Sequence, residues 1–214
     1  MEYINSSDLT LIGQGANSKV YRYSKPYGNG GLPAVVKIGR DNLPYFYQKN
    51  LELLKHAGLL TIAFAEQCSV EGKPAVIMYD LNAGDEVFVS PNTVRNNCRS
   101  EAEDYLLANK IDDIANFDNL LALMRDIVTC TNGKGIGFNM DMVFFGMKKG
   151  ESCPSVYYRL VDVDSMLCEP TMAYQLRDNN IISAKEALTL FIKYFVKQSD
   201  RQKELLSLVM KYNW

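Results

Sequence analysis

The chain reads LIGQGANSKVY over residues 11–21 and AVVKI over residues 34–38. Both stretches are rich in residues that favour β-strands, and a turn that carries Gly13 and Gly15 interrupts the first. The second stretch places Lys37 among apolar residues, where an unpaired ammonium group would be costly to remove from water. We therefore expect an anionic partner beside Lys37.

The two glycines indicate what a ligand at this turn would be. Without a Cβ atom, Gly13 and Gly15 let backbone N–H groups approach phosphate oxygens closely. Val20, on the following strand, would then cover an adenine ring. No Gly-Lys-Ser/Thr follows, which excludes a Walker phosphate loop, and a dinucleotide fold would need a helix rather than a second strand after the glycines. The turn predicts the front edge of an ATP site, with a plain hairpin as the alternative.

Residues 13–21 and 34–37 together resemble the glycine-rich loop and strand lysine of the protein kinase superfamily. The resemblance implies a two-lobed α+β fold with ATP and Mg²⁺ bound between the lobes. Under it, Lys37 holds the α- and β-phosphates. The other nucleotide-site residues that it implies in this region are Gly13, Gly15, Ser18, Val20 and Val35.

Residues 1–82 are expected to form a kinase-like N-lobe of five antiparallel strands and one helix. The expected strands cover residues 9–13, 19–24, 32–38, 61–70 and 74–79, and the helix covers residues 43–55 with Pro44 in its first turn. Lys37 should be held by an acid on this helix, and Glu52 is its only carboxylate. A solvated surface acid is the alternative interpretation of Glu52.

The segment AVIMYDLNAG, residues 75–84, resembles the passage from the fifth strand through the hinge in the same family. The resemblance makes Met78 the gatekeeper and gives the backbone from Tyr79 to Leu81 the hydrogen bonds to adenine. An edge strand that enters a polar loop is the alternative.

Residues 83–214 are expected to form a reduced, mainly helical C-lobe. Residues 86–97 look irregular and polar, whereas residues 100–110 and 113–130 have helical spacing. After Asp164 we expect a loop to Ile182, a helix that begins at a capping box of Ser183 and Glu186, and a last helix after Asp200.

An apolar strand near residues 158–161 delivers a carboxylate, Asp162, at its end. Asp162-Val163-Asp164 resembles the Asp-Phe-Gly segment that presents the metal ligand in kinases, in a spelling found in aminoglycoside-phosphotransferase-like and other divergent members. Because Mg²⁺ prefers oxygen ligands, Asp162 is the predicted metal ligand and Asp164 a second candidate. The alternative is that Asp162 and Asp164 are simply two acids at the end of a strand and bind no metal.

The expected catalytic loop departs from the family pattern of His-Arg-Asp with an Asn five places after the Asp. Residues 132–146 read NGKGIGFNMDMVFFG, without a histidine. If the next strand starts at Met142, Asp141 takes the place of the metal-binding Asn, and the base position is vacant or falls on Asn139. If Asp141 is the base, Gly146 occupies the position of the second metal ligand, and that ligand is lost. We prefer the first register, because Asp141 then stands directly before the apolar strand, at the position of the metal-binding Asn in the family pattern.

A missing base does not decide against activity. Phosphoryl transfer depends mainly on positioning and charge neutralisation, and a general base contributes about 10²–10⁴-fold. A slow kinase could survive its loss.

Composition argues against several other classes of protein. A formal net charge of -2 gives no electrostatic drive toward nucleic acid or a membrane surface. Five cysteines without a Cys-x-x-Cys pair, and a single histidine, argue against a structural zinc site and favour free thiols in a reducing compartment. The sequence lacks both a secretory signal pattern and a window long enough for a membrane span. We expect a cytosolic monomer. Export by a machine that needs no cleavable signal stays open.

About fifty residues follow Asp164, and no Ala-Pro-Glu-like segment closes an activation loop. This layout is similar to that of the minimal kinases that pathogenic bacteria inject into host cells. The similarity implies an atypical serine/threonine kinase, a virulence effector, whose substrate is a eukaryotic host protein. Three alternatives stay open: a pseudokinase that only binds a partner, a small-molecule kinase, and AMP transfer in the same cleft.

Overall fold

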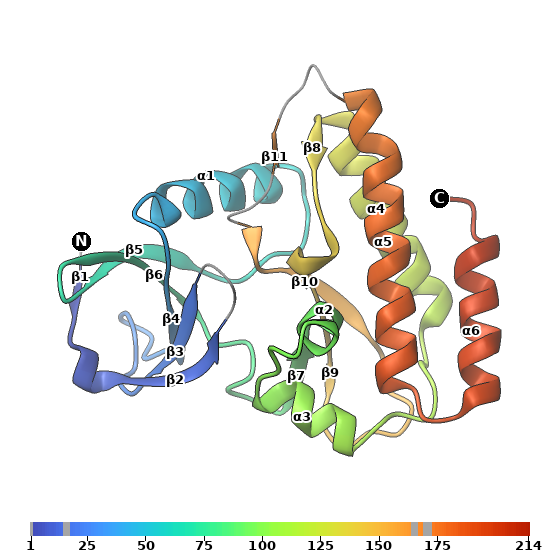
Figure 1. The fold of residues 1–214 in the computed structure, drawn as a ribbon, viewed down its shortest axis with the longest axis horizontal. Helices are drawn as coiled ribbons and strands as arrows, with labels where there is room; N and C mark the ends of the chain where they lie inside the picture. The colour runs from blue at the N-terminus through green and yellow to red at the C-terminus, as the bar shows by residue number, and fades with distance from the viewer. Residues whose placement is uncertain (1, 15–17, 164–166, 169–172) are drawn as a thin grey trace.

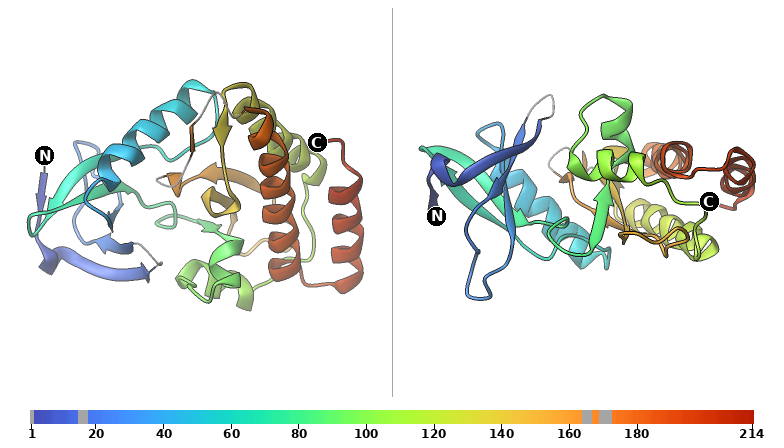
Figure 2. Two further views of the ribbon diagram at one scale, coloured as in Figure 1. Left: turned by 45° about the horizontal axis from the view of Figure 1, so that its top comes forward. Right: turned by 90° about the horizontal axis from the view of Figure 1, so that it is seen from below.

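The computed structural model describes residues 2–14, 18–163, 167–168 and 173–214. Gly15 and Asp164, both predicted for the nucleotide site, lie outside these residues. Within the described part, a six-stranded sheet with helix α1 (Leu43–His56) forms one side of the molecule, and a mainly helical part lies beside it (Figure 1). The fold is therefore mixed α+β, and two further views keep the sheet and the C-terminal helices at opposite ends (Figure 2).

The large sheet has the strand order β1-β5-β6-β4-β3-β2. Its strands are β1 (Glu2–Ile4), β2 (Leu9–Gln14), β3 (Lys19–Tyr23), β4 (Ala34–Ile38), β5 (Ala65–Val70) and β6 (Lys73–Tyr79). Strands β2 to β6 pair antiparallel, but β1 pairs parallel with β5 through Ile4 and Val70. The prediction of a five-stranded antiparallel sheet is therefore wrong at this edge. Strand β1 is short and only Ile4 in it is buried, so it has too few residues to show an alternating pattern.

Alternation along the central strands divides the core in two. Ala34 and Val36 of β4 face a small cluster that also contains Ile4 and Ile77. Val35 faces the main core with α1 and the helical part. Lys37 follows Val35 by two residues, so it must lie on the same face of the strand. The strand pattern alone thus directs the Lys37 side chain toward α1 and the helical part.

Helix α1 confirms the helix predicted for residues 43–55. Pro44 occupies its first turn, and Tyr47, Leu51 and Leu54 recur at the spacing of one buried helical face. Asn50 is also buried on this helix, at 4% exposure. A polar side chain at that depth requires a hydrogen-bond partner, which the site supplies.

The helical part contains a smaller sheet in the order β10-β9-β7. Its strands are β7 (Glu86–Val89), β9 (Val143–Lys148) and β10 (Tyr157–Leu160), and a separate pair joins β8 (Ile136–Gly137) to β11 (Leu167–Cys168). The helices are α2 (Pro91–Arg95), α3 (Glu101–Ala108), α4 (Phe117–Gly133), α5 (Ala173–Phe195) and α6 (Ser199–Lys211). Helices α3, α4 and α6 lie close to the predicted ranges.

Two predictions for this part are wrong. Residues 86–97 are not irregular, because Val87, Phe88 and Val89 are buried in strand β7 and helix α2 follows. Helix α5 begins at Ala173 rather than at Ser183, so the predicted capping box lies inside the helix and the loop to Ile182 does not exist as predicted.

A buried amide accounts for much of the difference at α5. The Asn180 amide nitrogen lies 2.8 Å from the Ile136 carbonyl oxygen and 3.1 Å from the Thr131 hydroxyl oxygen, and its amide oxygen accepts the Phe138 N–H at 3.0 Å. Asn180 is fully buried by these contacts between α5, α4 and β8. Tertiary hydrogen bonds therefore fix helical structure upstream of the local capping signal, and sequence periodicity does not reveal them.

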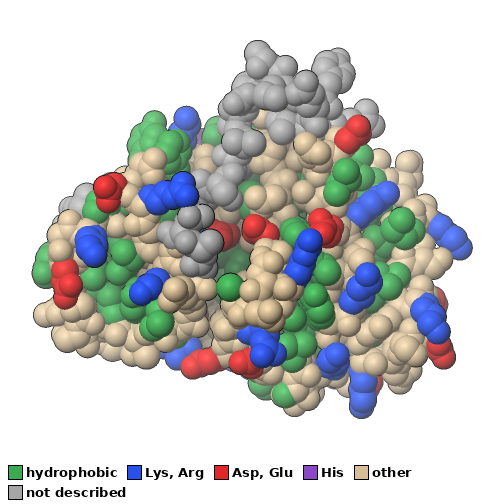
Figure 3. Space-filling model, viewed as in Figure 1, with side chains coloured by type: hydrophobic (Ala, Val, Ile, Leu, Met, Phe, Trp, Pro, Cys, Tyr) green, Lys and Arg blue, Asp and Glu red, His purple; other side chains and the backbone are tan. Residues whose placement is uncertain are grey.

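Charged side chains of both signs are spread over the face shown in Figure 3, with several acidic side chains across its middle. Among the helices in the described part of the chain, none combines the length and the apolar character that a membrane span requires. Four predictions stay predictions: that the protein binds no nucleic acid, that it binds no membrane, that it is a monomer, and that it is cytosolic. The predicted boundary between the two lobes, at residues 82 and 83, also stays a prediction.

Candidate functional site

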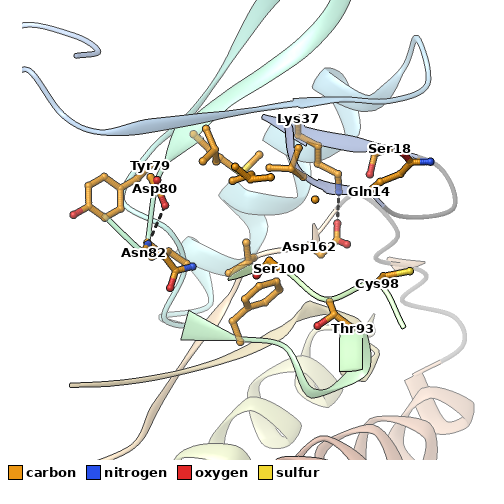
Figure 4. A pocket seen from close by; sticks show the side chains of 18 of the residues that line it. Gln14, Ser18, Lys37, Tyr79, Asp80, Asn82, Thr93, Cys98, Ser100 and Asp162 are labelled. Carbon is orange, nitrogen blue, oxygen red and sulfur yellow. Dashed lines mark hydrogen bonds and ion pairs between the residues drawn. The ribbon is translucent and has the colours of Figure 1, made fainter. Parts of the chain in front are cut away.

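A cavity of about 240 Å³ lies between the large sheet and the helical part. Described residues predicted for the nucleotide site line it from two directions. Those from the sheet and hinge are Gly13, Ser18, Val20, Val35, Lys37, Met78, Tyr79 and Leu81. Asp162 lines the cavity from the segment after β10 (Figure 4). The structure thus brings together nine residues that were chosen from the sequence.

Lys37 and Asp162 form an ion pair inside this cavity, although 125 positions separate them in the chain. The Lys37 side chain is 7% exposed and the Asp162 side chain 43% exposed. Figure 4 shows the ammonium group pointing down from β4 and the carboxylate rising from below to meet it. The expected anionic partner of Lys37 is therefore Asp162, the residue predicted to bind the metal.

The backbone around Asp162 is held on both sides. Strand β10 ends at Leu160, and the Val161 N–H donates to the Met142 carbonyl at 2.9 Å. The Tyr47 hydroxyl donates to the Val161 carbonyl, and the Asn50 amide donates to the Val163 carbonyl at 2.7 Å. Two side chains of α1 thus bind carbonyl groups of the residues before and after the acid.

The structure does not support Glu52 as the partner of Lys37. Glu52 is exposed on α1. The helix instead presents Tyr47, whose ring centroid lies 5.8 Å from the Lys37 ammonium nitrogen. Five residues of helix separate Tyr47 from Glu52, which turns the acid well away from the Tyr47 face.

The hinge contains a buried carboxylate that sequence reasoning missed. Asp80 is 6% exposed, and its side chain accepts the Asn82 N–H at 3.0 Å while its own N–H donates to the Pro33 carbonyl at 3.1 Å. Arg22 of β3 approaches the same carboxylate at 3.6 Å and pairs with Glu101 at the start of α3 at 3.1 Å. Asp80 therefore shapes the hinge backbone next to Tyr79 and Leu81.

A second missed group lies on the opposite wall, at the start of α3. Glu103 is 2% exposed and accepts the N–H groups of Ser90 at 2.9 Å and of Ser100 at 2.8 Å. Ser100 and Glu103 form a capping box, and both line the cavity together with Thr93 and Cys98. The spacing of Ser100 and Glu103 is the sequence signal that could have found this wall.

The predicted catalytic segment is a short 3₁₀ turn, Met140–Met142, with Asn139 as its N-cap. The Asn139 side chain accepts the Asp141 N–H at 3.1 Å. Strand β9 begins at Val143, directly after this turn and one residue later than the start at Met142 on which the preferred register was based. The roles proposed for Asp141 and Asn139 stay predictions.

Asp141 is half-buried and does not appear among the described residues that line the cavity. Burial raises the pKa of its carboxyl, Arg95 on α2 opposes that shift, and Glu186 on α5 adds to it. Arg95 pairs with Glu186 at 2.5 Å, so the local positive charge is already shared. The environment of Asp141 is thus set by α2 and α5 rather than by the nucleotide-site residues.

Among the described residues that line the cavity, Asp162 is placed to contact a metal ion bound together with a nucleotide. Within the described residues, no group of three His, Cys, Asp or Glu side chains is placed to hold a metal ion by itself. Mg²⁺ usually keeps several water ligands and takes one or two protein carboxylates together with substrate phosphates. A single partly exposed carboxylate beside a buried lysine meets that requirement.

Among the comparisons with known proteins, the one with solved structures finds similar chains. No family model and no curated protein matches the chain. Among solved structures, the chain is similar to WaaP as determined in complex with acyl carrier protein, with 10% identity and a TM-score of 0.49. The alignment covers 95% of this chain and 79% of the WaaP chain. At this identity and score, the likeness assigns no substrate, partner or activity.

Proposed function

We propose that this chain is a kinase-like protein that binds Mg-ATP in the cavity and transfers the γ-phosphate to a protein serine or threonine. One observation carries the proposal. Lys37 and Asp162 come from distant segments and meet in a cavity that the predicted glycine turn and hinge also line. A buried lysine, a carboxylate and backbone groups next to a glycine turn are the parts that phosphoryl transfer requires.

Each residue has a distinct part in this proposal. Lys37 would hold the α- and β-phosphates, and Gly13 and Ser18 would approach the phosphates from the β2–β3 turn. Asp162 would hold Mg²⁺, which neutralises phosphate charge and orients the transferred group when bound. Met78 and Val35 would contact the adenine, with hydrogen bonds from the hinge backbone.

In the transfer itself, a hydroxyl oxygen of the substrate bonds to the γ-phosphorus and the bond to the β,γ-bridging oxygen breaks. ADP is released, and the hydroxyl proton goes to Asp141 or to solvent. Asp141 stays the candidate base or second metal ligand, but because it does not line the cavity we expect its contribution to be small.

The size of the cavity suits a nucleotide. Its volume of about 240 Å³ is close to the range of about 300–1,000 Å³ that is usual for small-molecule sites. The hydroxyl group that accepts the phosphate would approach from outside this space. The proposal that the substrate is a host protein rests on the resemblance to bacterial effector kinases alone.

The test is incubation of the purified protein with γ-labelled ATP, Mg²⁺ and a eukaryotic cytosolic lysate. We expect label on a discrete protein band, and loss of that label in Lys37→Ala and Asp162→Ala. Lys73→Ala and Asp178→Ala change exposed residues of the same types and should keep the label. Label in either of the first two variants at the unchanged level would overturn the proposal, and transfer of α-label instead of γ-label would replace it with AMP transfer.

A second candidate function is that of a pseudokinase, which binds a nucleotide without transferring its phosphate. The observation that favours it is the position of Asp141, which is half-buried beside Arg95 and Glu186 and does not line the cavity. Mg-dependent ATP binding without label transfer to any lysate protein would support this candidate. Absence of ATP binding would contradict both.

A further inference from the structure

Helix α1 reaches the metal-binding segment through two neutral side chains. The Tyr47 hydroxyl donates to the carbonyl of Val161, and the Asn50 amide donates to the carbonyl of Val163 at 2.7 Å. These two carbonyl groups belong to the residues on either side of Asp162. The two contacts are one helical turn apart on α1, which lets both side chains leave the same face of the helix.

Both donors are buried among apolar residues, where an unpaired polar group would be unfavourable. Tyr47 is 0% and Asn50 4% exposed, and their neighbours Leu51 and Leu54 are buried on the same helix. A buried amide without partners costs more than an apolar side chain of the same shape. The presence of Asn50 in this stripe is therefore explained by the carbonyl that it binds.

Tyr47 also connects this segment to Lys37. Its ring centroid lies 5.8 Å from the ammonium nitrogen, while its hydroxyl reaches the Val161 carbonyl. A single buried ring therefore contacts both the strand that carries the lysine and the segment that carries the acid.

We propose that Tyr47 and Asn50 are positioning residues that fix the peptide units around Asp162 and so hold its carboxylate toward the phosphate and metal site. The inference rests on the proposed function. Fixing both carbonyl groups limits rotation of the backbone at Asp162 and so sets the direction in which its side chain leaves the backbone. The coupling of α1 to the site would then use neutral hydrogen bonds in place of an ion pair from an acid on this helix.

The test compares nucleotide affinity with and without Mg²⁺. Isothermal titration of ADP gives a dissociation constant under each condition, and their ratio measures the gain that the metal provides. We expect Asn50→Leu to lower this gain about tenfold and Tyr47→Phe about threefold, because each removes a hydrogen bond to the segment around Asp162. The Mg²⁺-free affinity, which depends on Lys37 and the hinge, should stay within about twofold.

A matched control comes from the same helix. The Gln48 side-chain oxygen accepts a hydrogen bond at 2.9 Å from the side-chain amide of Gln67 on β5, not from the segment around Asp162. Gln48→Met replaces an amide by an apolar side chain of similar shape, as Asn50→Leu does. The control should keep the full Mg²⁺ gain, which separates loss of position from a general weakening of α1.

A double variant tests whether the effect acts through the carboxylate. In the Asp162→Ala background, Asn50→Leu should cause no further loss of the Mg²⁺ gain. An additional loss of tenfold in that background would overturn the inference, as would an unchanged gain in both Asn50→Leu and Tyr47→Phe.

Hydrogen exchange gives a readout that is independent of nucleotide binding. The amide of Val161 donates to Met142, so its exchange reports opening of this segment. We expect faster exchange there in Asn50→Leu and Tyr47→Phe but not in Gln48→Met. Unchanged exchange would contradict the inference even if ATP binds. If the wild-type protein binds no nucleotide, the proposed function is contradicted, and the exchange result alone decides the positioning role of Tyr47 and Asn50.

Discussion

The proposed nucleotide site and the expected catalytic loop of this molecule differ in how completely they are assembled. Gly13, Lys37, Met78 and Asp162 all line one cavity. Asp141, the main candidate from the catalytic loop, is half-buried beside α2 and α5 and is not among the described lining residues. The comparison supports nucleotide binding more strongly than it supports rapid transfer.

The physical basis of the difference lies in the supporting structure. Lys37 is placed by a strand that pairs on both sides, with Val20 and with Val76. Asp141 is placed by a three-residue 3₁₀ turn, in which its N–H donates a capping hydrogen bond to the Asn139 side chain. A paired strand directs its side chains by the period of the sheet, whereas a short turn takes its orientation from the helices around it.

The largest expected effect is at Lys37. Lys37→Met should lower phosphate transfer by about 10²–10³-fold, the range for loss of one preorganised donor to a developing charge. Label transfer and ATP affinity measure it, with the exposed Lys73→Met as the control. A loss of transfer smaller than tenfold would contradict the phosphate-binding role of Lys37, and the difference between the proposed nucleotide site and the catalytic loop would then not hold.

Gly146→Ala should destabilise the helical part by about 1–3 kcal/mol, as overpacking of a core does. A Cβ atom at this position would lie 2.4 Å from a ring carbon of Phe88 on the paired strand β7. Chemical denaturation measures the change. Gly133→Ala, where an added Cβ meets nothing within 4 Å, is the control and should be neutral or slightly stabilising. Equal stabilities of the two variants would argue against the β7–β9 pairing.

The variant Asp141→Asn tests how much the expected catalytic loop contributes to transfer. Because Asp141 does not line the cavity, we expect transfer to fall by less than about tenfold, well short of the 10²–10⁴-fold that a general base supplies. Single-turnover label transfer measures it. A loss of 10²-fold or more would show that Asp141 acts on the substrate and that the loop moves into the site.

The same variant has a pH-dependent effect on stability. Burial raises the pKa of the Asp141 carboxyl, so the folded chain binds this proton more tightly than the unfolded chain does. The stability linked to this group is full below its unfolded pKa of about 3.9 and is lost as the pH rises through the folded pKa. Asp141→Asn should therefore be more stable than wild type at pH 7 by about 0.5 kcal/mol.

Urea denaturation without Mg²⁺ at pH 7 and near pH 4 checks this linkage. The gain in Asp141→Asn should shrink at the lower pH, where wild-type Asp141 is increasingly protonated in both states. Asp178→Asn, at an exposed position, should show no such trend. A gain that grows toward pH 4 would contradict the direction of the shift.

The smallest effect is expected at Glu52. Since this side chain is exposed and Asp162 pairs with Lys37, Glu52→Gln should leave ATP affinity and transfer within about twofold of wild type, as for most surface changes. A large loss would restore Glu52 as the helix partner of Lys37.

Local patterns predicted the parts of this protein whose cause is local. The glycine turn between two strands, the buried strand with Lys37, helix α1 with Pro44 in its first turn, and an acid after the β10 strand follow from residue spacing over a few positions. The missed elements lack such a pattern. Strand β1 has three residues, and β7 is a short apolar run inside a polar region.

The sequence by itself determined that a lysine would lie in a buried strand behind a glycine turn, because strand alternation and the cost of an unpaired charge act at the level of neighbouring residues. Only the tertiary structure decided that Asp162, rather than Glu52, would meet that lysine, since the choice depends on the approach of segments 125 positions apart. It also decided that α5 would begin at Ala173, and that α1 would hold Asp162 through Tyr47 and Asn50. Contacts of this kind depend on the packing of the whole core, which no short window of sequence contains.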